Sequence, residues 1–327
     1  MPVALSRSCS IHLFGLALVA SMMASACKKD EGAAPPPPLP AENPLRQLFA
    51  DHVEQATQHF TVNTDNGPAQ ITGAAGVHVA FAQHAFRKAD GTVATGTVEV
   101  ALVEALRVGD MLWLNKQTVG LENGVPKMLV SGGQFRLTAE QNGEPLVLAQ
   151  GASFISVPTV NPDPAMTVFS GMVQDDGTLL WDPWPINPID SSAADSSGSG
   201  GGGFSYDFPN DSLGWINCDY FYSYPPPLTS LQVTCEPQYD HLNTLVWVIF
   251  PEINSMASLT NGEDNQFGTY PGYEVPVGMN ITVVALAQVD GAYLSCFINT
   301  VATAGMNLPV TLVPTTLEEF QLEAGQL

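Results

Sequence analysis

The chain has 327 residues and a formal net charge of −22 at pH 7, from 10 Lys and Arg against 32 Asp and Glu. Such an acidic surface repels phosphate backbones, so we expect no nucleic-acid partner. The last basic residue is Arg136, which excludes a Lys nucleophile or an Arg clamp from residues 137–327. The length suits two domains that each bury a core of their own.

The first 26 residues have the layout of a secretory signal peptide. Arg7 supplies the positive charge, the mostly apolar run Ile11–Met23 follows, and the small residues 24–26 lead directly to Cys27. The apolar run is shorter than the roughly 20 residues that a membrane-spanning helix needs. We therefore predict that residues 1–26 are removed on export.

The position of Cys27 resembles the lipobox of bacterial lipoproteins, in which the signal is cut before the Cys and the thiol is acylated. Ala24 stands where that motif usually has Leu, and ordinary cleavage after Ala26 is the alternative. Several acyl chains on one residue give stable anchoring, whereas a single chain binds a membrane only marginally. The resemblance predicts Cys27 as the lipidation site and the membrane as a partner through that anchor.

The charged segment after Cys27 resembles the short export signal that sends lipoproteins of Bacteroidota-type bacteria to the outer face of the outer membrane. A solvated charge cluster at the root of a tether is the other interpretation. The resemblance implies an outer membrane lipoprotein at the cell surface, with a periplasm-facing lipoprotein as the alternative. The residues of this predicted export signal are Lys28, Lys29, Asp30 and Glu31.

Residues 27–57 read as a tether that ends in a short helix. Four consecutive prolines within residues 33–40 favour extended polyproline II, which acts as a semi-rigid spacer. The segment Leu45–Thr57 has apolar residues at helical spacing, which predicts a short amphipathic helix. Its apolar face consists of Leu45, Leu48, Phe49 and Val53.

From Phe60 onward the sequence is typical of β-structure. Asn-Gly and Asp-Gly pairs recur, and such pairs suit tight hairpin turns because they tolerate positive φ. Around Asn142-Gly143, for example, Phe135, Leu137 and Ala139 alternate with polar residues before the turn. Short strands with regular turns favour sandwiches or barrels, so we predict a mainly β fold.

A composition break divides this β-rich part. Residues 191–203 contain only Ser, Ala, Asp and Gly, which predicts a flexible linker. We therefore expect two β-sandwich-like domains, residues 58–186 and 204–327, joined by a linker over residues 187–203. Near the end of the chain, Thr316 and Glu319 have capping-box spacing, which predicts a short terminal helix.

A series of short motifs runs in a fixed order through the first predicted domain and into the second. The segments are Ile71–Gly73, Gly96–Ala105, Asp110–Leu112, Thr118-Val119, Ser131–Gly133, Ala139–Gly143, Leu146–Gly151 and, at the start of the second domain, Leu213–Asp219. Through them the first domain resembles a ZU5-like module, and the order of the motifs is similar to that in uncharacterised surface lipoproteins of Bacteroidota. The resemblance covers about two thirds of the chain after residue 26 and implies a β-sandwich in an interaction or structural protein, without catalytic residues. It is an analogy of fold and carries little functional weight by itself.

Cysteines and acidic clusters supply few candidates for chemistry. Cys235 and Cys296 are expected to face a core, where they would form a disulfide or remain reduced as small hydrophobes. No metal motif is present, but two oxygen-rich clusters are candidates for Ca²⁺, with ordinary turn chemistry as the alternative. These clusters are Asp207, Asn210 and Asp211, and Glu263, Asp264 and Asn265. We expect no catalytic residue, because neither GxSxG nor HExxH occurs.

Aromatic residues concentrate at the start of the second predicted domain. Trp215 and Phe221 share one strand parity, which we expect to face the core. Tyr220, Tyr222 and Tyr224 share the other, and they are candidate ligand-binding aromatics that stack on sugars or anchor a protein. We therefore expect a non-catalytic structural or adhesion-type lipoprotein with an unknown protein or glycan partner. The alternative is a carbohydrate-binding lipoprotein of a glycan-capture system, and an unrecognised hydrolase ranks third.

Overall fold

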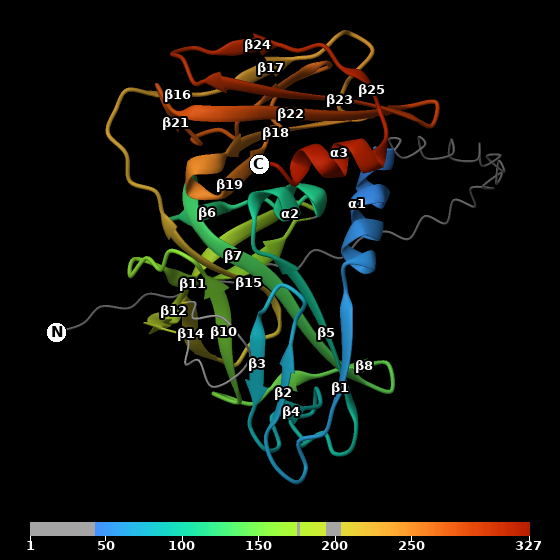
Figure 1. The fold of residues 1–327 in the computed structure, drawn as a ribbon, viewed down its shortest axis with the longest axis vertical. Helices are drawn as coiled ribbons and strands as arrows, with labels where there is room; N and C mark the ends of the chain where they lie inside the picture. The colour runs from blue at the N-terminus through green and yellow to red at the C-terminus, as the bar shows by residue number, and fades with distance from the viewer. Residues whose placement is uncertain (1–42, 175–176, 194–203) are drawn as a thin grey trace, which may run out of the picture. The chain divides into compact units, whose positions relative to one another are not determined.

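The structure is a computed structural model that describes residues 43–174, 177–193 and 204–327. Strands dominate it, as Figure 1 shows, so the predicted mainly β fold is confirmed. Three clusters of buried apolar side chains lie between its layers. We call the cluster that contains Val79 and Leu102 the first, the one that contains Val246 and Phe267 the second, and the one that contains Trp181 and Trp247 the third. The helical elements are α1 (Pro44–Gln55), α2 (Val108–Trp113), α3 (Leu317–Ala324) and the short 3-10 turn η1 (Pro251–Ile253).

An eight-stranded sheet lies at the centre of the fold. Its strands are β1 (Gln58–Val62), β5 (Val98–Ala105), β6 (Val119–Glu122), β7 (Val125–Gln141), β8 (Glu144–Pro145), β11 (Thr167–Val173), β12 (Leu179–Pro188) and β15 (Gly214–Phe221). The long strand β7 pairs with β5, β6, β8 and β15. Because β15 pairs with β11, β11 with β12 and β12 with β6, five strands form a closed ring of pairings. Such closure removes exposed strand edges.

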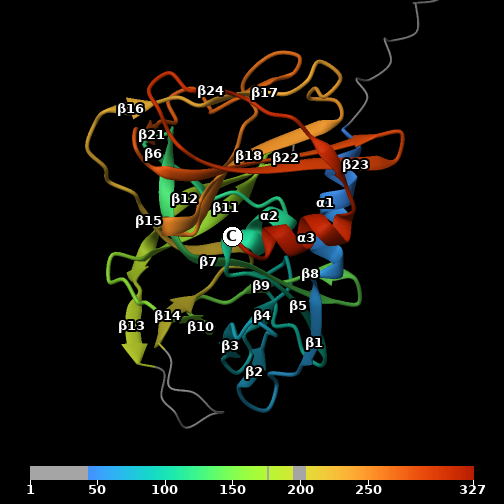
Figure 2. The ribbon, with the colours of Figure 1, turned by 45° about the horizontal axis from the view of Figure 1, so that its top comes forward.

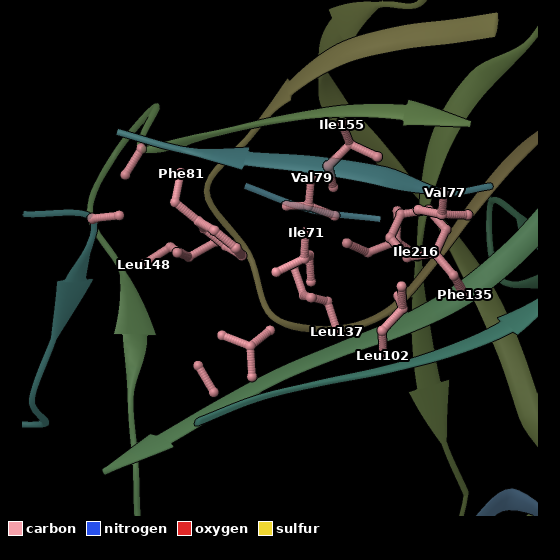
Figure 3. Packing of buried hydrophobic residues seen from close by; sticks show 14 of the residues in the cluster. Ile71, Val77, Val79, Phe81, Leu102, Phe135, Leu137, Leu148, Ile155 and Ile216 are labelled. Carbon is pink, nitrogen blue, oxygen red and sulfur yellow. The ribbon is translucent and has the colours of Figure 1, made fainter. Parts of the chain in front are cut away.

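A five-stranded sheet, which we call the outer sheet, packs on one side of the central sheet. Its strands, in spatial order, are β13 (Asp190–Ala193), β14 (Phe204–Asn210), β10 (Ser153–Thr159), β3 (His78–Phe81) and β2 (Ala69–Thr72). The first cluster fills the space between the two sheets, and Figure 3 shows Val79 and Ile155 of the outer sheet packed there with Leu102 and Leu137 of the central sheet. This part of the chain is therefore a β-sandwich.

A second five-stranded sheet, the inner sheet, lies beyond the helices (Figure 2). Its strands, in spatial order, are β19 (Ser255–Ser258), β18 (Thr244–Phe250), β22 (Asn280–Val289), β23 (Ala292–Val301) and β25 (Val313–Thr315). Smaller sheets complete the fold, and they are formed by β20 (Gln266–Gly268), β17 (Gln232–Thr234) and β24 (Asn307–Pro309), by β16 (Leu228–Thr229) and β21 (Val275–Pro276), and by β4 (Phe86–Arg87) and β9 (Val147–Leu148).

Both faces of the inner sheet are buried along its strands β18 and β22. Along β18, Val246 and Val248 belong to the second cluster, which the β17 sheet covers, whereas Trp247 and Ile249 belong to the third cluster. Successive side chains of a strand point to opposite faces, so this alternation means that apolar layers lie above and below the sheet. The third cluster also contains side chains of the central sheet and of all three α-helices.

The two predicted helices are confirmed. Helix α1 starts after Asn43, whose side chain accepts a hydrogen bond from the backbone N–H of Leu45, and its residues Leu45, Phe49 and Val53 enter the third cluster. Helix α3 starts with the predicted capping box of Thr316 and Glu319. Each cap satisfies backbone N–H groups that the first helical turn leaves without partners. The short helix α2 was not predicted, because six residues carry too little periodicity.

Several Asn-Gly and Asp-Gly pairs form the predicted hairpin turns. Asn123-Gly124 joins β6 to β7, Asn142-Gly143 joins β7 to β8, and Asp290-Gly291 joins β22 to β23. In each pair both residues have positive φ, between 51° and 80°. Two consecutive residues with positive φ are the requirement of a type I′ hairpin turn, which explains why Asn or Asp precedes Gly at these points.

The predicted domain boundary at residues 187–203 is wrong. Strand β12 extends to Pro188 and β13 covers Asp190–Ala193, and β14 returns to pair with β10 of the outer sheet. The next strand, β15, inserts between β7 and β11 of the central sheet. Strands on both sides of the boundary therefore share two sheets, and residues 41–327 form one compact unit. The Ser/Gly-rich residues 194–203 lie outside the described residues.

Candidate functional site

The residues predicted to mediate anchoring and export lie outside the described part of the chain. They are Cys27, Lys28, Lys29, Asp30 and Glu31. The predicted signal peptide, residues 1–26, lies there as well. Among the helices that the structure describes, none is both long and apolar enough to cross a membrane.

The three candidate tyrosines do not form one strip. Tyr220 packs against the first cluster, whereas Tyr222 and Tyr224 pack against the second, with their ring centroids 5.3 Å apart. The hydroxyl of Tyr224 donates a hydrogen bond of 2.8 Å to the carbonyl of Glu274, and burial raises the pKa of that hydroxyl. All three are half-buried, so each offers only part of its ring to a ligand. The predicted core-facing pair is confirmed, because Trp215 and Phe221 both pack in the third cluster.

The two candidate disulfide cysteines are both buried in the second cluster, as the strand parity predicts. Each thiol is free, so no disulfide joins Cys235 to Cys296 in this structure. Burial raises the pKa of Cys235 to about 12 and that of Cys296 to about 11. Thiols with such pKa values are almost wholly protonated near neutral pH and are poor nucleophiles.

The two candidate Ca²⁺ clusters do not gather into cages. The carboxylate of Asp207 accepts a hydrogen bond from Ser205, while the amide of Asn210 donates to Ser153 and to the carbonyl of Ser212. In the other Ca²⁺ candidate, which consists of Glu263, Asp264 and Asn265, the Asn265 amide donates to the carbonyl of Cys235. Within residues 43–174, 177–193 and 204–327, no three His, Cys, Asp or Glu side chains gather in a way that would hold a metal ion.

A polar connection between the central and inner sheets was missed by the sequence analysis. The Thr118 hydroxyl lies 2.6 Å from the Ser255 hydroxyl and accepts a hydrogen bond from the Met256 N–H. The Gln117 amide oxygen accepts from the Ser258 N–H, and the Trp247 indole donates to the Asn115 side chain. These bonds join residues more than a hundred positions apart, so no local pattern indicates them.

Asn254 is the second part of this connection. It has a left-handed backbone conformation, with φ of 51°, at the end of η1. Its amide donates to the carbonyls of Leu106 and Ser131, and its oxygen accepts from the Val108 N–H at 2.7 Å. One side chain thus satisfies three backbone groups of the central sheet and α2, which fixes the inner sheet against them.

Two cations, one in the loop between α2 and β6 and one in β7, lie beside one indole ring. The ammonium of Lys116 is 5.8 Å from the ring centroid of Trp215, and the guanidinium carbon of Arg136 is 5.9 Å from it. Burial, and to a smaller extent the positive charge of the nearby Arg136, lowers the pKa of Lys116 to about 8. The indole partly offsets the cost of burying these charges through cation–π attraction.

A buried polar pair lies on the side of β15 that carries Trp215. Asp219 and Asn217 are fully buried, and the Asn217 amide donates a hydrogen bond of 2.5 Å to the Asp219 carboxyl. Ser131 contacts Asn217 at 3.3 Å, while Oδ1 of Asp219 has no hydrogen-bond partner among the described residues. Burial raises the pKa of the Asp219 carboxyl well above its usual range, because a charged form loses its hydration there.

The outer sheet has one buried face and one partly exposed face. Its buried face forms one wall of the first cluster, and the side chains that alternate with those residues point away from it. Phe154 in β10 is 47% exposed on that opposite face. Register places Phe154 beside Ala80 and Pro209, and places Ser156 beside His78 and Asp207. Periodicity predicts the strands, but their pairing, which creates these rows, depends on contacts distant in sequence.

Fold and surface together define a mainly β protein of stacked sheets with one open sheet face. No family, no curated protein and no solved structure matches the chain.

Proposed function

We propose that the protein is a membrane-anchored cell-surface lipoprotein that acts as a non-catalytic structural or interaction module. The observation that carries this proposal is the contrast between a continuous, doubly buried interior and an open face on the outer sheet. Binding faces on rigid sheets hold their side chains in place without a large ordering cost. The predicted lipid on Cys27 would hold this body at a membrane through the tether, and the ZU5-like resemblance agrees with a structural or interaction role.

Fractionation and mass spectrometry test the anchor. The full chain is expressed in a bacterium that processes lipoproteins, and the mature N-terminus is analysed. The proposal predicts a chain that starts at Cys27 with a lipid adduct, found in the membrane fraction and degraded by protease added to intact cells. An unmodified chain starting at Cys27 would make the protein secreted instead. Protection from protease until the outer membrane is broken would reject surface display.

Substitution at the anchor provides the matched control. Cys27→Ser removes the thiol that the acyl chain needs, whereas Cys296→Ser changes a buried thiol far along the chain. We expect only the first variant to leave the membrane fraction, because the acyl chains predicted on Cys27 supply the attachment. Retention of Cys27→Ser at the membrane would contradict lipid anchoring.

Carbohydrate binding in a glycan-capture system is the second candidate function. The half-buried pair Tyr222 and Tyr224 gives it some support, because tyrosine rings combine an apolar face with a hydroxyl. The open face of the outer sheet supports it more strongly.

A further inference from the structure

The open face of the outer sheet is built from two registered rows of side chains. The first row crosses β2, β3, β10 and β14 with Gln70, Ala80, Phe154 and Pro209, and the second row crosses the same strands with Thr72, His78, Ser156 and Asp207. The rows are two residues apart along each strand, or roughly 6.6 Å. Figure 3 shows the other side of this sheet, where Ile71, Val79 and Ile155 point into the first cluster.

The first row contains one partly exposed aromatic ring, that of Phe154. Phe154 has Ala80 and Pro209 as its direct cross-strand neighbours, and neither is long enough to cover the ring. An exposed ring costs stability, since burying a phenylalanine is worth about 1.5–3 kcal/mol. The position of Phe154, between small neighbours on a sheet whose opposite face is tightly packed, suits stacking by an external apolar surface.

The second row supplies hydrogen-bonding groups next to that ring. The Thr72 hydroxyl lies 3.0 Å from Nδ1 of His78, and the Ser205 hydroxyl donates to the Asp207 carboxylate at 3.0 Å. These contacts orient the imidazole of His78 and the carboxylate of Asp207, which are both half-buried, with Oδ1 of Asp207 enclosed. Hydroxyl, imidazole and carboxylate groups can each donate or accept a hydrogen bond with a sugar hydroxyl.

The charge of this face and the small extent of its apolar part indicate which kind of partner it binds. Neither row contains Lys or Arg, and the chain as a whole has a net charge of −22, so an anionic polymer would be repelled. A stable protein interface needs about 800 Å² per partner around an apolar centre, whereas here one ring borders a polar row. A neutral sugar chain matches both properties, because each ring offers an apolar face and a rim of hydroxyls.

We propose that the open face of the outer sheet binds a neutral glycan, with Phe154 stacking on a sugar ring and the Thr72–Asp207 row bonding to its hydroxyls. The inference deepens the proposed interaction role and rests on it for access to glycans outside the cell. It places the site on the outer sheet, and not at Tyr222 and Tyr224.

Affinity electrophoresis and calorimetry of the full chain in detergent test this site. The probes are four neutral polysaccharides, namely a β-glucan, a xylan, a mannan and a starch-type glucan, with polygalacturonate as the acidic counterpart. We expect binding to at least one neutral polymer and none to polygalacturonate. Phe154→Ala should weaken binding about tenfold or more, Phe154→Trp should preserve it, and Ala80→Lys should block it by covering the ring.

Control variants distinguish loss of binding at Phe154 from misfolding and from binding elsewhere on the protein. Val313→Ala changes another exposed apolar residue, on β25, and should leave binding unchanged. Phe154→Ala should fold, since the ring is half exposed, and its thermal transition is recorded alongside. The inference is overturned if no neutral polymer binds, if Phe154→Ala binds as tightly as the unaltered chain, or if only Tyr222→Ala and Tyr224→Ala lose binding. The anchor and protease experiments stand separately, so they can succeed while this inference fails.

Discussion

The inner and outer sheets have the same number of strands but opposite environments. The inner sheet has apolar clusters on both faces, and its strands β18 and β22 are nearly continuous apolar runs. The outer sheet has one face on the first cluster and one face open, so buried and more exposed residues alternate along β3 and β10. The sequence pattern of a strand therefore depends on what covers its sheet. A sheet covered on both faces has continuous apolar strands and forms the core, whereas a sheet covered on one face leaves the other face available as a surface.

The largest expected difference comes from removing one aromatic ring from each sheet. Trp247→Ala removes a fully buried side chain of the inner sheet and leaves the Asn115 oxygen without its indole donor. We expect a loss of about 3–5 kcal/mol in the free energy of unfolding. Phe154→Ala in the outer sheet should cost under about 1 kcal/mol, as exposed positions usually do. Urea unfolding measures both, and equal losses would contradict the contrast.

The polar connection should give an intermediate effect. Asn254→Gly keeps the left-handed backbone conformation accessible but removes three hydrogen bonds to buried backbone groups. We expect a loss of about 1–3 kcal/mol in the free energy of unfolding. Asn254→Ala should lose roughly 1 kcal/mol more, because a side chain with Cβ is strained at positive φ. If Asn254→Gly unfolds like the unaltered chain, the connection contributes nothing to stability.

Asp219 should produce an effect on the free energy of unfolding that depends on pH. Burial raises the carboxyl's pKa in the folded state, so the folded state binds more protons than the unfolded state between the two pKa values. Its contribution therefore favours folding less as pH rises above about 4, by at most about 1.4 kcal/mol per pH unit. Asp219→Asn cannot ionise, so its stability relative to the unaltered chain should rise from pH 4 to pH 8.

Paired unfolding curves at several pH values check the Asp219 prediction. The matched control is Asp264→Asn, which changes an exposed carboxyl for which no comparable burial exists. A difference between Asp219→Asn and the unaltered chain that stays constant with pH would mean that the carboxyl is already charged in the folded state.

Local features of the fold were predictable from the sequence, whereas the partners of the strands were not. Asn142-Gly143 and the caps Asn43 and Thr316 act within a few residues, so their conformations follow from propensity. The pairing of β15 with β7 joins residues about 80 positions apart, and no local sequence feature of either strand identifies its partner. A Ser/Gly-rich segment therefore suggested a boundary between domains, although strands on both sides of it share sheets.

The sequence contains a signal for the buried inner sheet but none for the candidate site. The uninterrupted apolar run of β22 is typical of a strand buried on both faces, and it contradicts an independent sandwich with one exposed side. Phe154, in contrast, looks like any apolar residue in a strand until register places Ala80 and Pro209 beside it. Sites built from cross-strand rows need the pairing first, which is why the tyrosines were singled out and Phe154 was not.

Differential scanning calorimetry of the full chain tests the central claim, that the doubly buried inner sheet joins the whole described body into one cooperative unit. The account predicts a single transition in which the calorimetric enthalpy equals the van't Hoff enthalpy. Two separate transitions, with only the earlier one sensitive to Trp247→Ala, would mean that the halves are independent domains and would contradict the account.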